Sequence, residues 1–97
     1  MSELQQIQQT LKTHGNALAG RYHVRRFGVF GSVVHGDQTA TSDIDVLVEF
    51  SRPIGLFQFI ELEEELKALL NKDVDLVTPN ALHPLIKTDV LRETVYV

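Results

Sequence analysis

The chain has 97 residues, which suits one domain, and 43% of them are hydrophobic, enough to build a core and to argue against disorder. The formal charge of −4 argues against broad binding to a nucleic-acid backbone, which needs a basic face, but allows a nucleotide held through metal ions. The chain has no cysteine and therefore no disulfide or thiolate site, and no apolar run suits a membrane span or a secretory signal, so we expect a cytoplasmic protein.

A helix is predicted near the N-terminus, where Ser2 and Gln5 form a capping box and apolar residues recur at helical spacing. We expect this helix to cover residues 3–13. The letters HGN at residues 14–16 are typical of a break, and a further helical turn is expected over residues 17–22.

Two strands are predicted next, over residues 24–30 and 44–50, and the second is rich in branched residues. Residues 33–38 between them fit neither a helical nor a strand pattern, and Gly36-Asp37 predicts a turn near their end. Because a turn-rich segment joins the two strands, we expect them to be antiparallel.

The remaining elements are a long amphipathic helix over residues 55–71, a short strand over 74–78 and a helix over 81–93 that is interrupted or begins around Pro84. The order helix, strand, strand, helix, strand, helix predicts an α/β fold. We therefore expect one small domain over residues 1–97, with a mixed β-sheet flanked by helices.

Two aspartates lie at the start of the strand predicted over residues 44–50: Asp43 directly precedes it, and Asp45 interrupts its apolar run. Because side chains alternate along a strand, Ile44, Val46 and Val48 should face the core, whereas Asp43 and Asp45 share the other face. Their Cα atoms should lie about 7 Å apart, so the two carboxylates can converge on one Mg²⁺ or on two neighbouring ions. The alternative is the solvated face of an edge strand, and an isolated Asp-x-Asp pattern does not decide between them.

A second acidic pair, Asp73 and Asp75, occurs in the letters KDVDLVT. Asp75 stands between two apolar residues, which favours a functional role, whereas Asp73 is expected to be a solvated residue at the strand end. If this strand lies beside residues 44–50, Asp75 joins Asp43 and Asp45, and three carboxylates make a two-metal site feasible.

Gly31-Ser32 closes the first strand. Glycine allows close approach of the backbone to a ligand, and backbone N–H groups together with the Ser32 hydroxyl can bind phosphate oxygens. The pair alone is a weak signal, because most Gly-Ser pairs are ordinary turns.

Gly31-Ser32, a ten-residue spacer, the Asp43 and Asp45 pair and the later Asp75 together resemble the signature of the nucleotidyltransferase superfamily that includes DNA polymerase β. The short chain resembles the minimal nucleotidyltransferases (MNT) of that superfamily. The resemblance implies a polymerase-β-like nucleotidyltransferase fold. It also implies that Asp43, Asp45 and Asp75 are the catalytic residues and hold two Mg²⁺ ions, with Asp75 helping to deprotonate the attacking hydroxyl, and that Gly31 and Ser32 bind the nucleotide.

Minimal nucleotidyltransferases are often paired with a helical HEPN-domain ribonuclease toxin. The resemblance therefore implies the antitoxin of a type VII-like toxin–antitoxin pair, a Mg²⁺-dependent protein adenylyltransferase (AMPylator) that transfers AMP from ATP to a tyrosine of the toxin, with no direct contact to nucleic acid or membrane. The alternatives are an antitoxin that neutralises by binding alone and the catalytic subunit of a small-molecule nucleotidyltransferase. One position departs from the family pattern, because His35 stands where arginine is common.

Apolar residues are more frequent in the helix at residues 55–71 than one narrow stripe requires. Further apolar residues follow in the C-terminal letters DVLRETVYV, namely Val90, Leu91, Val95 and Tyr96. These residues either cover the sheet or form a surface for the partner protein.

Overall fold

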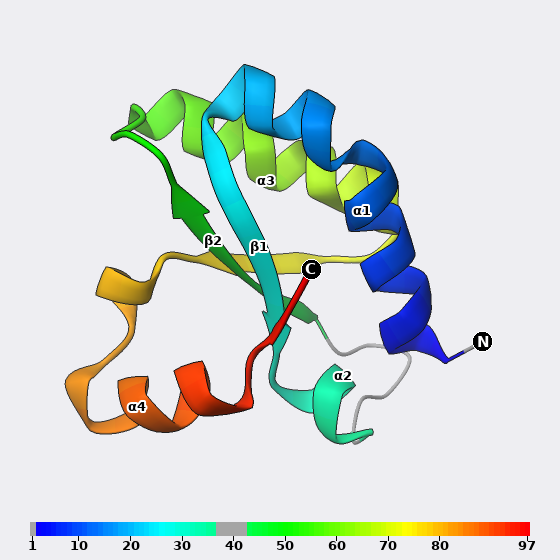
Figure 1. Ribbon diagram of the computed structural model, residues 1–97, viewed down its shortest axis with the longest axis vertical. Coiled ribbons are helices and arrows are strands. Elements are labelled where there is room, and N and C mark those ends of the chain that lie inside the picture. The colour runs from blue at the N-terminus through cyan, green and yellow to red at the C-terminus, as the bar shows by residue number, and fades with distance from the viewer. Residues whose placement is uncertain (1, 37–42) are drawn as a thin grey trace.

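The computed structural model describes residues 2–36 and 43–97, so the end of the unassigned segment at residues 33–38 lies outside the described residues (Figure 1). In chain order the elements are α1 (Glu3–Tyr22), β1 (Val24–Phe30), α2 (Ser32–His35), β2 (Ile44–Phe50), α3 (Leu56–Leu70), β3 (Val74–Val77), the 3₁₀ helix η1 (Pro79–Ala81), α4 (Pro84–Glu93) and β4 (Val95–Tyr96). Within the described ranges, no helix is both long and apolar enough to cross a membrane.

The strands form one sheet in the order β3-β2-β1-β4. β1 runs antiparallel to both β2 and β4, whereas β2 and β3 are parallel. The antiparallel pairing of the first two strands and the mixed sheet are therefore confirmed. Because of these directions, the end of β1 lies beside the starts of β2 and β3.

The core lies between the sheet and two helices, α1 and α3, which cover the same face of the sheet (Figure 1). Strand residues at alternate positions point into this layer, and the helices contribute leucines at helical spacing. The side chains that are almost fully buried there are Val29, Val46 and Val48 from the strands and Leu11, Leu18, Leu62 and Leu66 from the helices. The opposite face of the sheet carries Asp45, as the alternation in β2 predicted.

The N-terminal helix is longer than expected, because α1 continues through residues 14–16 without a break. The expectation of two helical segments was therefore wrong. A glycine inside a helix costs about 1 kcal/mol relative to alanine. Leu18 and Tyr22 continue the buried stripe of the first half, and burying each such side chain contributes about 2 kcal/mol. Packing therefore outweighs the local preference of Gly15 for a break.

The C-terminal residues differ from expectation in one way. α4 begins at Pro84, one of the two alternatives expected for this helix, but β4 follows it as an edge strand that the sequence did not indicate. β4 pairs with Gly28 and Val29 of β1. A Cβ at Gly28 would lie 2.4 Å from a methyl carbon of Thr94, so this glycine lets the C-terminal segment approach the sheet. Val95 and Tyr96 are therefore part of the sheet.

Candidate active site

Three strand ends bring the predicted site residues together. Asp45 lies opposite Phe30, the last residue of β1, and beside Asp75 in the parallel pairing of β2 with β3. Side chains that are directly opposite share a face, so Asp45 and Asp75 point to the same side of the sheet. Gly31 and Ser32 directly follow Phe30 in the sequence. Residues that are widely separated in the sequence thus meet at one end of the sheet.

Gly31 stands directly against the carboxylate of Asp45. Its backbone has φ 76° and ψ −148°, a conformation that is essentially restricted to glycine. A Cβ at Gly31 would lie 2.2 Å from Oδ2 and 3.0 Å from Cγ of Asp45. Glycine is therefore required here for its conformation and for its lack of a side chain.

Asp45 is half-buried and carries a charge that its surroundings disfavour. Burial raises the pKa of Asp45 above its ordinary value of 3.8, and the negative charges of Asp75 and Asp43 raise it further. A cation placed among these carboxylates would reverse the repulsion, and oxygen ligands are those that Mg²⁺ prefers. The donor chemistry of the three aspartates therefore fits a magnesium site.

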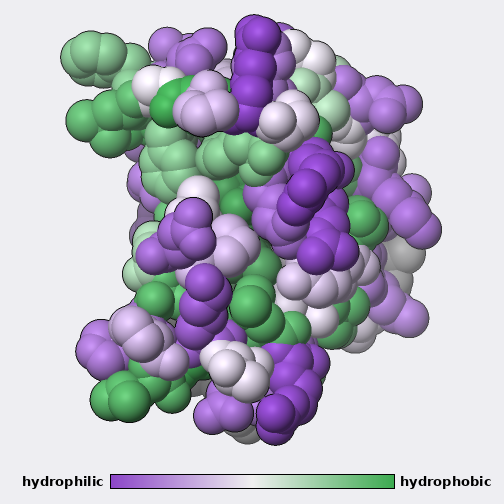
Figure 2. All heavy atoms as spheres, turned by 60° about the vertical axis from the view of Figure 1, so that its left-hand side comes forward, coloured by the Kyte–Doolittle hydropathy of each residue, from purple (hydrophilic) through white to green (hydrophobic). Residues whose placement is uncertain are grey.

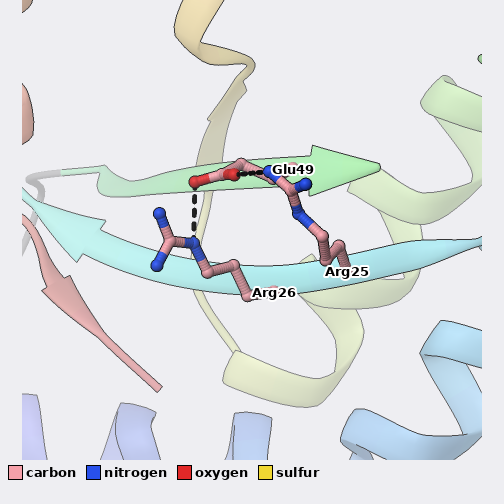
Figure 3. A network of polar contacts seen from close by, with 3 residues as sticks. All are labelled: Arg25, Arg26 and Glu49. Atoms are coloured by element: carbon pink, nitrogen blue, oxygen red, sulfur yellow. Dashed lines mark hydrogen bonds and ion pairs between the residues drawn. The ribbon is translucent and has the colours of Figure 1, made fainter. Parts of the chain in front are cut away.

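Glu49 lies four residues further along β2, and its electrostatic environment is the opposite of that of Asp45. Arg25 and Arg26 from β1 both form ion pairs with Glu49, the second at 2.8 Å between Nε and Oε2 (Figure 3). The hydrogen bond from Arg25 is the main reason why the pKa of Glu49 is lowered, although burial opposes it. The guanidinium of Arg26 also stacks over the ring of Tyr96, 3.8 Å from its centroid. Glu49 is thus already compensated by the protein, which sets it apart from the aspartate cluster.

A sequence profile of the nucleotidyltransferase domain matches residues 11–97. The chain belongs to the nucleotidyltransferase domain family. The resemblance found in the sequence is thereby confirmed, together with its α/β fold. The elements that the profile covers include all of the strands that carry the site residues.

Relatives of this nucleotidyltransferase support the same assignment. The protein adenylyltransferase MntA of Thermococcus cleftensis is 47% identical over 97 residues, covering 100% of this chain and 98% of the relative. A solved structure named as a minimal nucleotidyltransferase superposes with a TM-score of 0.77 at 32% identity, covering 98% of this chain and 95% of the other. The complex of an MNT antitoxin with the tri-AMPylated HEPN toxin of Shewanella oneidensis matches with a TM-score of 0.65 at 21% identity, over 93% and 70% of the two chains. The last match shows the fold alone.

The aspartates of this nucleotidyltransferase lie in one region but do not form a preformed metal-binding site. Asp43 and Asp75 are exposed, and within the described residues no group of three or more histidine or acidic side chains is arranged to hold an ion. The metal and nucleotide roles of the predicted residues therefore stay predictions.

His35 has a contact that the sequence did not indicate. Its Nε2 atom lies 3.0 Å from Oε2 of Glu93, at the end of α4. The contact joins the short helix after Gly31-Ser32 to the C-terminal segment. The two residues are 58 positions apart in the sequence, and only the packing of α4 brings them together.

Asp73 is exposed, as expected, and contributes through its backbone. Its carbonyl oxygen accepts a hydrogen bond of 2.9 Å from the backbone N–H of Ile44. This bond fixes the start of β2 beside β3, and hence the relative position of Asp45 and Asp75.

Proposed function

We propose that this nucleotidyltransferase is a protein adenylyltransferase antitoxin that transfers AMP from ATP to a tyrosine of a HEPN ribonuclease toxin. We also propose that it acts in the cytoplasm, where ATP and the RNA targets of such a toxin occur, and that residues 1–97 act as a single domain. The observation that carries the proposal is the position of Asp45, held between Asp75 and the Gly31 turn in a family member that is 47% identical to a protein adenylyltransferase over its full length.

The site residues divide into two groups by their chemistry. Asp43, Asp45 and Asp75 would hold Mg²⁺, which supplies stabilisation of the negative charge that develops around the α-phosphorus. Gly31 and Ser32 would hold the β- and γ-phosphates, with backbone N–H groups and the Ser32 hydroxyl as donors. The protein thus positions the two reactants and leaves little covalent work for its own side chains.

The reaction is a displacement at the α-phosphorus of ATP. The tyrosine oxygen of the toxin forms a bond to this phosphorus, the bond to the bridging oxygen of the β-phosphate breaks, and pyrophosphate leaves. The phenolic proton must be removed as the new bond forms, and we assign to the exposed Asp75 the role of helping to accept it. The exposure of Asp75 and Asp43 leaves room for a macromolecular acceptor.

Coexpression with the toxin tests this function, and the chain offers a matched control. Asp75→Asn removes a carboxylate of the proposed site, whereas Asp73→Asn makes the same change two residues earlier, at an exposed position. The intact mass of the toxin should show added AMP with the wild-type chain and with Asp73→Asn, and should show none or little with Asp75→Asn. If the toxin is neutralised equally by all three chains and carries no AMP, the antitoxin acts by binding alone.

A further inference from the structure

The outward side of α3 carries large hydrophobic side chains that the core does not use. Within the described part of the chain, the exposed large hydrophobic residues are Leu56, Phe57, Ile60, Leu85 and Ile86. The first three lie in the first turns of α3, and the exposed fraction of Phe57 is 82%. Figure 2 shows hydrophobic side chains projecting at the margins of one face of the molecule, with polar and apolar side chains mixed between them. The start of α3 is thus apolar for a reason other than burial in the domain.

Further along α3, the same side of the helix carries acidic residues. Phe57, Glu61 and Glu64 are spaced by four and three residues and therefore lie along one line of the helix, and both glutamates are exposed. α3 carries four glutamates and one lysine, Lys67, which lies 3.6 Å from Glu64 and 3.9 Å from Glu63, and Glu65 forms an ion pair with Arg21 of α1. Exposed pairs of this kind contribute little, and the helix keeps an excess of negative charge. We call Leu56, Phe57, Ile60, Glu61 and Glu64 the α3 face.

We propose that the α3 face docks on the basic, RNA-contacting side of the ribonuclease toxin, an inference that rests on the function proposed above. A ribonuclease must present positive charge to the phosphates of RNA. The acidic half of the α3 face complements that charge, and its apolar half is suited to a groove, as in other helix-in-groove complexes. A second copy of this chain is a poor occupant, because it would bring two acidic helices together.

Docking through the α3 face would separate the surface that binds the toxin from the aspartates of the candidate active site. α3 follows the end of β2, whereas Asp45 lies near the start of that strand. The five residue steps from Asp45 to Phe50, at the end of β2, span about 17 Å. Substitutions on the α3 face should therefore change the affinity for the toxin without changing the rate at which bound toxin is modified.

Binding of purified, unmodified toxin in the absence of ATP tests the surface directly. Phe57→Ser should raise the Kd about tenfold or more, as expected for a buried aromatic anchor. Leu85→Ser is the matched control, because Leu85 lies on α4 and has an exposed fraction of 84%; it should change the Kd by less than about threefold. The inference fails if Phe57→Ser binds within about threefold of the wild type, or if Leu85→Ser loses as much affinity.

Charge reversal provides an independent test of the same surface. Glu61→Lys should slow association with the toxin and weaken its dependence on salt, whereas Asp89→Lys, the same change on α4, should have a much smaller effect. Equal effects of the two variants would mean that only net charge matters, and would overturn the proposal. The proposal would also be overturned if the wild-type chain associates with itself, and if Phe57→Ser abolishes this self-association without changing the affinity for the toxin.

AMP transfer separates this inference from the proposed function. With Phe57→Ser, the KM for the toxin should rise about tenfold while kcat stays unchanged, because the variant lies outside the catalytic cluster. If the wild-type chain binds the toxin but transfers no AMP, the proposed function fails. The docking of the α3 face is then decided by the Kd values of the variants alone. If the wild type transfers AMP and Phe57→Ser binds as tightly, only the docking surface is wrong.

Discussion

Replacing Gly31 with alanine should damage both stability and activity, and Gly36 separates the two effects. Gly31 has positive φ with ψ −148°, a region that costs other residues about 1–3 kcal/mol. Gly36 also has positive φ, 75°, but its ψ of 15° is left-handed helical, where alanine costs about 1–2 kcal/mol. In a domain of this size, each kcal/mol lowers the melting temperature by about 4–8 °C. Both alanine variants should therefore melt earlier than the wild type.

Only the Gly31→Ala variant should also disturb the carboxylate of Asp45. Its new Cβ would lie 2.2 Å from Oδ2, so Asp45 must move by about 1 Å to reach an ordinary contact distance, whereas a Cβ at Gly36 has no neighbour within 4 Å. A displacement of this size in a catalytic site costs about 10²-fold in rate. AMP transfer, measured well below both melting temperatures, should fall about 10²-fold for Gly31→Ala and less than about threefold for Gly36→Ala. Equal activities of the two variants would refute this account of Gly31.

Further expectations concern the charge and the phosphate contacts of the same site. Asp45→Asn should lower AMP transfer at least about 10²-fold and yet raise the melting temperature of the metal-free protein at neutral pH. The direction of this change follows from the raised pKa of Asp45. Above the ordinary pKa of 3.8, Asp45 loses its proton more readily in the unfolded chain than in the folded chain, so its ionisation lowers the free energy of unfolding. The gain in melting temperature of the Asn variant should therefore vanish when melting is measured below that pH. Added Mg²⁺ should raise the melting temperature of the wild type and should have little effect on Asp45→Asn; equal stabilisation of both by Mg²⁺ would place the ion elsewhere. Ser32→Ala should weaken ATP binding about tenfold or more without lowering the melting temperature, whereas the reverse pattern in a titration and a melt would make Ser32 a structural turn residue.

The sequence predicted the placement of the aspartates on the sheet better than it predicted the local structure around them. The alternation in residues 44–50 placed Asp45 opposite the core face, and the structure confirms this placement beside Asp75. Such a prediction succeeds because a strand has a two-residue period, so a few buried branched residues fix the direction of every side chain. The specific roles of these residues in binding metal and nucleotide stay predictions.

The errors lie where contacts distant in the sequence outweigh local preference. Gly15 indicated a helix break, but the burial of Leu18 and Tyr22 keeps α1 continuous. Tyr22 also donates a hydrogen bond of 2.8 Å to Oε2 of Glu65 on α3, a partner 43 residues away. β4 has only two residues, too few for any periodicity, and it forms because the edge of β1 is available for pairing.

Leu47 illustrates a further limit of the sequence pattern. It shares the face of Asp45 by alternation, and its side chain is almost fully buried there. The C-terminal segment approaches the same face at Gly28, which lies opposite Leu47 in the sheet. The contact between His35 and Glu93 has the same origin, because α4 must first return to the sheet. No local pattern reveals such a contact.

The intact mass of purified toxin after incubation with this chain, ATP and Mg²⁺ decides whether the chain is a protein adenylyltransferase. The wild-type chain should add AMP to a toxin tyrosine, and Asp43→Asn should reduce the rate at least about 10²-fold while still binding the toxin. Removal of Mg²⁺ by a chelator should stop transfer by the wild type. Unmodified toxin in the wild-type reaction, or equal modification by Asp43→Asn, would contradict the account.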